Sequence, residues 1–200
     1  SSRIEEIVVT GRRRDEMIQK VPLSIVAFES NDIEARGLVQ IDDLGRSVAG
    51  LKFDTIPGTD NTARVFIRGV GQVSGSDELD PGVAVYVDGV YYPRLLGSVI
   101  PLLDLERVEV LRGPQGTLFG KNTVGGAIQL VTRKPGSELA AKTQLRVGNR
   151  DLLETQASFD VPLVPERVFS RISLATATDD GFVTNVLDGA KAGDNKLLAG

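Results

Sequence analysis

LERVEVLRGPQGTLFGKNTVGGAIQLVTR, residues 105–133, is the stretch of this 200-residue chain that decides its fold. Valine alternates with other side chains from Val108 to Arg112, and this period of two predicts a short β-strand. Gly113-Pro114 ends that strand, and residues 127–131 predict a second strand because they are rich in β-forming side chains. The glycines between the two strands predict a tight path with close backbone approach; they are Gly116, Gly120, Gly125 and Gly126.

This glycine-rich stretch does not match a nucleotide-binding loop. A phosphate-binding P-loop reads G-x-x-x-x-G-K-S/T. Gly116 and Gly120 are too close together for that pattern, and the correctly spaced Gly125 is followed by glycine and alanine. What remains is a motif that shapes the fold and binds no ligand.

The composition indicates a sheet- and turn-rich chain and excludes several classes of function. Hydrophobic residues make up 41% and aromatic residues only 5%, with 22 glycines and no tryptophan. The net charge of −4 and the lack of a basic stripe argue against nucleic-acid binding. Because the sequence has no Cys and no His, thiolate zinc sites and thiol or histidine catalysis are excluded within these residues. We therefore expect no enzyme, no catalytic residue, no metal site and no cofactor, and the apolar runs are too short for a transmembrane helix.

Before residue 105, predicted strands alternate with short helices. One helix is predicted over residues 31–36, capped by Ser30 or Asn31 and closed by Gly37. Another is predicted over residues 41–48, where apolar residues recur at i, i+3 and i+7. Strands are predicted over residues 23–28, 51–53, 64–68 and 83–87. Together these elements predict an α+β domain, a small mixed β-sheet with short helices.

From residue 139 onward, apolar and polar side chains alternate over residues 141–147, 154–161 and 168–174. A period of two with one apolar and one polar face is typical of the wall of a membrane β-barrel. A soluble antiparallel sheet with one face in water has the same pattern, and alternation does not decide between them. Residues 196–199 are expected to open a further strand. The sequence therefore predicts antiparallel strands after the mixed domain.

The motif at residues 105–133 resembles the signature of TonB-dependent outer-membrane receptors, E-V-L-R-G-P-x-G-x-L-Y/F-G-x-x-x-x-G-G-x-I-x-x-x-T. The matching residues are Glu109, Val110, Leu111, Arg112, Gly113, Pro114, Gly116, Leu118, Phe119, Gly120, Gly125, Gly126, Ile128 and Thr132. Gln129 is a mild departure, because Asn is more usual there. Residues 67–69 and 85–90 resemble other segments of the same family.

The resemblance implies a plug domain followed by the first strands of a transmembrane β-barrel. Residues 1–15 would be a TonB-box-like segment, residues 16–136 the plug and residues 137–200 the first barrel strands. Plugged barrels of this kind close with about 22 strands, and open strand edges cannot remain in lipid. We therefore expect the sequence to be a fragment of a longer receptor or a truncated gene product.

The resemblance also implies a function, which is energy-coupled uptake of a scarce nutrient across the outer membrane. A ferric siderophore is the commonest cargo of the family, with cobalamin, haem and glycans as others, and no residue here selects among them. Iron would arrive within the transported ligand, so no cofactor is implied. The plug would lie in the barrel lumen, with its N-terminus in the periplasm. The alternative is a non-transporting signalling or adhesion module that interacts with TonB.

Residues 4–10 form a β-prone run that is followed by a highly charged segment. Such a run is either an edge strand of the domain or a docking peptide. The run resembles the TonB box of the family, E-x-I-V-V-T. By that resemblance, main-chain pairing between strands would bind the C-terminal domain of TonB through Ile7, Val8, Val9 and Thr10.

Two other sets of residues are candidates for functional contacts. By resemblance, a dense charge cluster would latch the plug to the barrel wall; its members are Glu106, Arg107, Glu109 and Arg112. Aromatic and guanidinium groups bring large contact area and planar hydrogen bonding. On that ground the ligand-contact candidates are Tyr91, Tyr92 and Arg94, with Gln72 from the preceding loop. For the tyrosines, packing against the barrel wall is the alternative.

Overall fold

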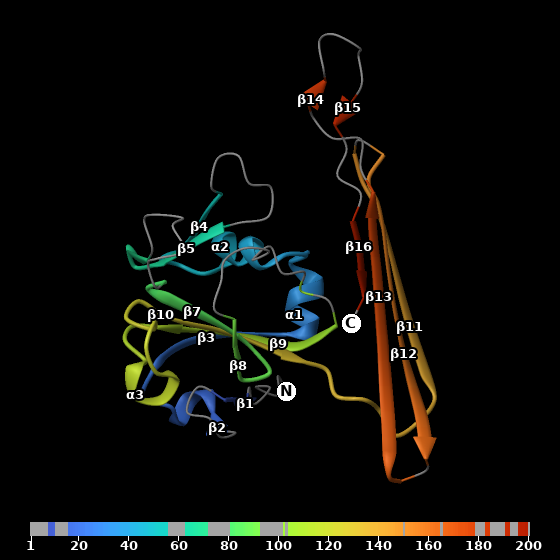
Figure 1. Ribbon diagram of the computed structural model, residues 1–200, viewed down its shortest axis with the longest axis horizontal. Coiled ribbons are helices and arrows are strands. Elements are labelled where there is room, and N and C mark those ends of the chain that lie inside the picture. The colour runs from blue at the N-terminus through green and yellow to red at the C-terminus, as the bar shows by residue number, and fades with distance from the viewer. Residues whose placement is uncertain are drawn as a thin grey trace, which may run out of the picture. The chain divides into compact units, whose positions relative to one another are not determined.

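A computed structural model of the chain describes residues 8–10, 16–55, 63–71, 81–92, 102, 104–149, 151–164, 166–178, 183–184, 191–192 and 196–199. The chain divides into two compact units, Ser1–Arg133 and Lys134–Gly200, and Figure 1 shows the elements of each. None of the helices in the described ranges has the length and apolar character needed to cross a membrane.

The first unit is built on a five-stranded mixed sheet with the strand order β3-β9-β10-β7-β8 (Figure 1). β9 (Leu105–Arg112) and β10 (Gly126–Thr132) are the two strands predicted from the motif, and they pair antiparallel with each other. β3 (Ser24–Glu29) pairs antiparallel with β9 on its other side. β7 (Val83–Val87) runs parallel to β10 and pairs with β8 (Val90–Tyr92). The predicted small mixed sheet is therefore confirmed.

Short helices and a second small sheet complete this unit. α1 (Ser30–Ala35) follows β3 directly, and the 3-10 turn η2 (Ile41–Asp43) leads into α2 (Leu44–Ser47). The second sheet is antiparallel, and its strands in order are β4 (Leu51–Thr55), β5 (Ala63–Ile67) and β6 (Val70–Gly71). The remaining short elements are β1 (Val8–Val9), β2 (Glu16–Met17), the 3-10 turn η1 (Ile18–Lys20) and α3 (Gly116–Phe119).

The cap of α1 differs from the prediction. The N-cap residue is Glu29, whose backbone N–H donates to Asp32 Oδ2 at 3.4 Å. Ser30 and Asn31 lie within the helix, so the prediction that one of them caps it is wrong. The reason is that β3 runs into α1 without a linker, which places the cap on the last residue of the strand. Gly37 follows the helix with φ +63°, as its predicted closing role requires.

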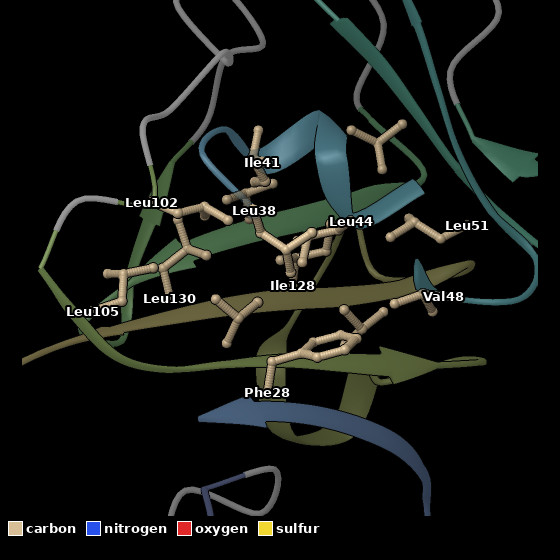
Figure 2. Close-up of a cluster of buried hydrophobic side chains, with 14 of the residues drawn as sticks. Phe28, Leu38, Ile41, Leu44, Val48, Leu51, Leu102, Leu105, Ile128 and Leu130 are labelled. Atoms are coloured by element: carbon tan, nitrogen blue, oxygen red, sulfur yellow. The ribbon is translucent and has the colours of Figure 1, made fainter. Parts of the chain in front are cut away.

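The main core lies between one face of the five-stranded sheet and the segment that contains η2 and α2. The predicted apolar stripe is confirmed, since Ile41, Leu44 and Val48 are 1%, 0% and 3% exposed. Figure 2 shows Leu44 in the same cluster as Ile128 of β10. Val108 of β9 belongs to the same cluster and is 0% exposed. Burial of each such aliphatic side chain contributes about 1.5–3 kcal/mol, so this layer fixes the helices on the sheet.

The opposite face of the sheet is also buried. Ala84, Leu111 and Ala127 are each 0% exposed, and they form a second cluster with Tyr86 and Phe119. A strand that is buried on both faces has a near-continuous apolar sequence instead of a strict alternation. This explains why Leu111 interrupts the alternation that begins at Val108.

Gly125 and Gly126 confirm the predicted close backbone approach. A Cβ on Gly126, where φ is +147°, would lie 2.2 Å from a carbonyl oxygen of β9. A Cβ on Gly125 would lie 2.8 Å from a carbonyl oxygen of β6. Gly120 is needed for its backbone conformation, because its φ is +82°, and not for space, since nothing lies within 4 Å of a Cβ placed there. Gly116 has neither constraint, since nothing lies within 4 Å of a Cβ placed there.

The second unit is an antiparallel sheet with the strand order β11-β12-β13-β16 (Figure 1). Its strands are β11 (Ala140–Val147), β12 (Leu153–Val164), β13 (Val168–Thr178) and β16 (Lys196–Ala199). β14 (Val183–Thr184) and β15 (Lys191–Ala192) pair separately. The predicted strands are confirmed, and β12 and β13 extend beyond their predicted ends.

One face of this sheet is apolar and exposed. The pairing register places Leu145 and Val147 of β11, Phe159 of β12, and Ile172 and Leu174 of β13 on the same face. These side chains are between 41% and 73% exposed. A soluble sheet buries its apolar face, whereas a barrel wall turns that face to lipid. The exposure therefore favours a barrel wall over a soluble sheet.

The opposite face of the sheet carries the polar side chains, and they are paired with one another. Arg171 donates to Asp160 Oδ2 at 2.6 Å and to the Ser158 hydroxyl oxygen at 3.0 Å. Arg146 and Glu154 form an ion pair across β11 and β12 at 2.8 Å. Asp160 and Ser158 are only 9% and 8% exposed. The polar side chains of this face thus bond to one another, which agrees with a polar barrel interior.

We expect Gly126→Ala to lower the free energy of unfolding of the first unit by about 3 kcal/mol. The new Cβ would overlap backbone of β9, which cannot move without loss of its pairing with β10. Gly116→Ala is the matched control, with an expected change within about 0.5 kcal/mol. Urea denaturation measures both, and equal effects of the two substitutions would contradict the packing assigned to Gly126.

Candidate functional site

The N-terminal segment predicted as a docking peptide contains a short strand. β1 pairs antiparallel with β2, with Val8 opposite Met17 and Val9 opposite Glu16. The side chains of the two valines point in opposite directions, as in any strand, so that Val8 is 41% exposed and Val9 is 0% exposed. Ile7, the first residue of the predicted docking peptide, lies outside the described residues. The described part of the segment is thus anchored through Val9.

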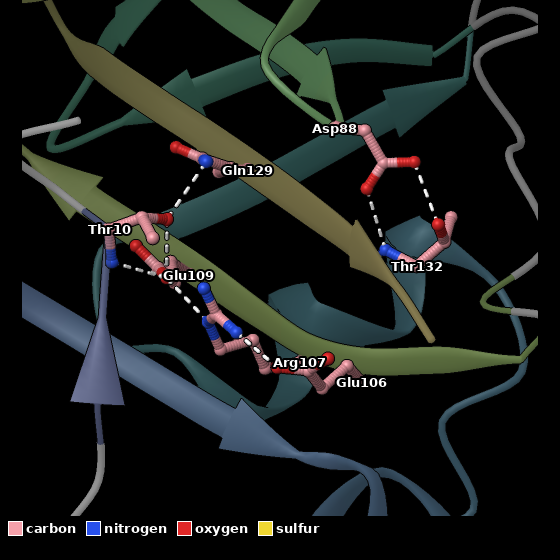
Figure 3. A network of polar contacts seen from close by, with 7 residues as sticks. All are labelled: Thr10, Asp88, Glu106, Arg107, Glu109, Gln129 and Thr132. Carbon is pink, nitrogen blue, oxygen red and sulfur yellow. Dashed lines mark hydrogen bonds and ion pairs between the residues drawn. The ribbon is translucent and has the colours of Figure 1, made fainter. Parts of the chain in front are cut away.

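Thr10, directly after β1, is held by two neighbouring strands of the five-stranded sheet (Figure 3). Its backbone N–H donates to Glu109 Oε1 at 2.7 Å, and its hydroxyl donates to the same oxygen at 2.9 Å. Gln129 Nε2 donates to the Thr10 hydroxyl oxygen at 2.9 Å. Glu109 of β9 and Gln129 of β10 are register partners, so their side chains lie on the same face of the sheet. We call this set of three residues, Thr10, Glu109 and Gln129, the Thr10 clamp.

Glu109 is a charged residue in the interior of the first unit. It is 0% exposed, and Arg107 Nε donates to its Oε1 at 2.9 Å. The Arg107 side chain, 11% exposed, also pairs with Glu106. A buried carboxylate needs ion pairing and hydrogen bonds in place of its lost hydration. Three donor groups supply this at Oε1, whereas Oε2 has no hydrogen-bond partner among the described residues.

The predicted latch residues lie in different environments. The Glu106 side chain is 44% exposed, while Arg107 and Glu109 bond to each other within the first unit. Arg112, at the end of β9, is half-buried, and its Nη1 lies 3.5 Å from the Ala49 carbonyl oxygen. Contact of these four residues with a barrel wall stays a prediction.

The two tyrosines predicted as ligand contacts also differ from each other. The Tyr91 hydroxyl accepts a hydrogen bond from Asn122 Nδ2 at 2.8 Å, and its ring centroid lies 5.5 Å from that of Tyr86. Tyr91 therefore takes part in the packing of the first unit, whereas Tyr92 is 43% exposed. The other two candidates, Gln72 and Arg94, lie outside the described residues.

Gln129 and Asp88 make tertiary contacts but were not among the residues predicted for a site. The one signal for Gln129 was its departure from the more usual Asn of the motif. Asp88, in the turn between β7 and β8, accepts hydrogen bonds from the Thr132 N–H at 2.8 Å and from its hydroxyl at 2.7 Å (Figure 3). This contact ties the turn to the end of β10. In the part of the chain that the structure describes, no group of acidic side chains could hold a metal ion.

The first unit is thus a mixed sheet with short helices, and antiparallel strands with an exposed apolar face follow it. The family model "TonB-dependent Receptor Plug Domain" matches residues 17–127, which contain β3, β7, β8 and β9. The chain belongs to the family of TonB-dependent receptors.

Three curated relatives show the range of the family. The chain is 30% identical over 185 residues to the pesticin receptor of Yersinia pestis, which covers 92% of the chain and 27% of the receptor. It is 33% identical over 147 residues to an iron-regulated outer membrane virulence protein of Vibrio cholerae, covering 70% of the chain and 22% of that protein. It is 28% identical over 206 residues to a vitamin B12 transporter of Vibrio cholerae, covering 97% of the chain and 32% of the transporter. The chain thus spans about a third or less of these relatives.

Solved structures agree with this assignment. The ferric yersiniabactin uptake receptor of Yersinia pestis superposes with a TM-score of 0.78 at 28% identity, over 88% of the chain and 28% of that receptor. The pyoverdine receptor of Pseudomonas aeruginosa superposes with a TM-score of 0.72 at 22% identity, over 88% of the chain and 25% of that receptor, and supports the fold. The chain is accordingly an outer-membrane protein, and these relatives are receptors and transporters, not enzymes.

We expect Arg107→Met to lower the free energy of unfolding by about 3–5 kcal/mol, because it leaves the Glu109 carboxylate buried without its counter-ion. Lys52→Met is the matched control, since the Lys52 side chain is 71% exposed in its ion pair with Asp54. An exposed pair contributes at most about 1 kcal/mol. Urea denaturation of the two variants gives the comparison, and similar losses in both would show that Glu109 does not depend on Arg107.

Proposed function

We propose that the whole protein is an outer-membrane receptor that takes up a scarce nutrient with energy delivered through TonB. A ferric siderophore is the proposed cargo. The observation that carries this proposal is the similarity to the ferric yersiniabactin uptake receptor, which extends over 88% of the chain at 28% identity. Similarity to a vitamin B12 transporter, at 28% identity, keeps cobalamin as the competing cargo.

In this proposal, residues 7–10 are the segment that TonB binds. A strand-adding partner recognises main-chain groups of an extended segment. Two features support this role: Val8 and Val9 are already extended, and they form only a two-residue ladder with β2. Because only two residue pairs join β1 to β2, few hydrogen bonds would be lost if β1 paired with a longer strand of a partner instead.

The rest of the chain would divide as the family resemblance implies. Residues 1–15 would be the docking segment, residues 16–136 the plug and residues 137–200 the first strands of the barrel. The exposed apolar face of β11, β12 and β13 would contact lipid, because lipid is the solvent such a face requires. Glu106, Arg107 and Arg112 would connect the plug to the barrel wall, while the fully buried Glu109 would act only by holding Arg107. Tyr92 with Gln72 and Arg94 would contact the ligand.

The cargo is tested by uptake into cells that lack their own siderophore receptors and produce the complete protein. We expect radioactive iron to accumulate from at least one of a panel of ferric siderophores. Val8→Pro should leave siderophore binding at the cell surface intact and abolish accumulation, because a proline lacks the N–H that strand pairing uses. Accumulation of labelled cobalamin without any of the ferric siderophores would overturn the proposed cargo.

The docking role is tested by binding of a peptide of residues 1–15 to the purified C-terminal domain of TonB. We expect the wild-type peptide to bind and the Val8→Pro peptide to bind at least about tenfold more weakly, since it loses a main-chain hydrogen bond and fits a ladder poorly. A peptide with the same composition in scrambled order is the control. If the wild-type and scrambled peptides bind alike, residues 7–10 are an ordinary strand of the plug.

A further inference from the structure

The second unit begins with a short segment, residues 134–139, that connects β10 of the first unit to β11. We call this segment the tether. Its Gly136 N–H donates to Asp160 Oδ1 at 3.1 Å, although Asp160 lies on β12, 24 residues later in the chain. Ala140, the first residue of β11, is the register partner of Asp160. Residues 136–140 therefore form a loop whose two ends both meet Asp160.

The side chain of Asp160 is fixed from the side that faces away from this bond. It is 12% exposed, and Arg171 Nη1 donates to its Oδ2 at 2.6 Å. Arg171 Nη2 donates in addition to the Ser158 hydroxyl oxygen at 3.0 Å. Charge-assisted hydrogen bonds of this kind are short and strong. They hold the carboxylate in one orientation, in which its Oδ1 accepts the bond from the tether.

Gly136 fits this carboxylate because it has no side chain. A Cβ at this position would lie 3.2 Å from Asp160 Oδ2 and 3.3 Å from its Cγ, which is closer than ordinary van der Waals contact. Glycine thus permits the close approach of the tether backbone. Gly136 is also half-buried, whereas the other five residues of the tether are exposed. The tether is therefore held at this residue.

The chain just before the tether is held inside the first unit. The Arg133 N–H donates to the Asp104 carbonyl oxygen at 3.0 Å, and Arg133 Nη2 donates to the Ser30 hydroxyl oxygen at 2.8 Å. Only Lys134 and Pro135 lie between Arg133 and Gly136. Proline fixes its own φ and restricts the residue before it to extended conformations. The free connection between the two units is thus two residues long and stiff.

We propose that Asp160, oriented by Arg171, is a positioning residue that anchors the tether at Gly136 and limits the reach of the connection between the two units. With this anchor, three Cα–Cα steps separate Arg133 from a fixed point, which allows a reach of about 11 Å. Without it, seven steps to Ala140 allow about 25 Å. The inference goes beyond the proposed function, because it depends on neither the cargo nor TonB.

A nitroxide label on the tether tests the anchor in the complete protein in outer-membrane vesicles. Glu138→Cys, as the single cysteine, places the label on an exposed residue beyond Gly136. Electron paramagnetic resonance then gives the ratio of mobile to slow label. Asp160→Ala removes the anchoring carboxylate. Glu154→Ala is the matched control, because it removes another carboxylate from the same face of β12, where Glu154 pairs with Arg146 at 2.8 Å.

We expect Asp160→Ala to raise the ratio of mobile to slow label about tenfold, because it removes a hydrogen bond to a charged group. Glu154→Ala should leave the ratio unchanged. Equal ratios in these two variants would overturn the anchor, and so would a label that is as mobile in the unsubstituted protein as in urea.

Gly136→Ala is the second variant, since it adds a Cβ against Asp160 and keeps the ion pair of Asp160 with Arg171. We expect a higher ratio of mobile to slow label with an unchanged urea midpoint, because the substitution displaces the tether and not the sheet. If Asp160→Ala does not assemble in the membrane, this variant decides the test alone. An unchanged ratio in Gly136→Ala would overturn the anchor.

Discussion

The pairing of β9 with β10 is the constraint on which the first unit depends. β9 also pairs with β3, and β10 also pairs with β7, so the two strands join both halves of the sheet. Side chains of this pair enter apolar clusters on both faces of the sheet. Gly126 allows the strands to approach, because any Cβ there would overlap the backbone of β9. Separation of β9 from β10 would therefore open both cores together.

This strand pair was predictable because its determinants are local. Strand-forming side chains, the break at Gly113 and the run of glycines all lie within residues 105–133. The surroundings of Glu109 were not predictable in the same way. A charge between valines usually indicates a solvent-facing side, and two of the three donors that compensate the burial of Glu109 come from Thr10, 99 residues earlier in the chain. The prediction of the α1 N-cap was wrong for a related reason. β3 runs directly into α1, so the cap falls on Glu29, the last residue of the strand.

The second unit shows what alternation alone leaves undecided. The period of two placed the strands, but it did not say whether the apolar face is buried. The register brings Arg171, Asp160 and Ser158 together on one face, and it places Phe159, Ile172 and Leu174 on the other. Because this apolar face is exposed while the polar side chains pair with one another, the sheet is suited to lipid on its apolar side.

The contacts of the first unit also differ in whether they break together or separately. An apolar core unfolds cooperatively, because opening it exposes many side chains at once, whereas a short peripheral segment can unfold alone. β1 is attached by a two-residue ladder, by the burial of Val9 and by hydrogen bonds from Thr10, each worth about 1–3 kcal/mol. A pull on the N-terminal segment therefore breaks these few directional contacts before it reaches the pairing of β9 with β10. Glu109 belongs to both systems, since it lies on β9 in the core of the sheet and also accepts both hydrogen bonds from Thr10.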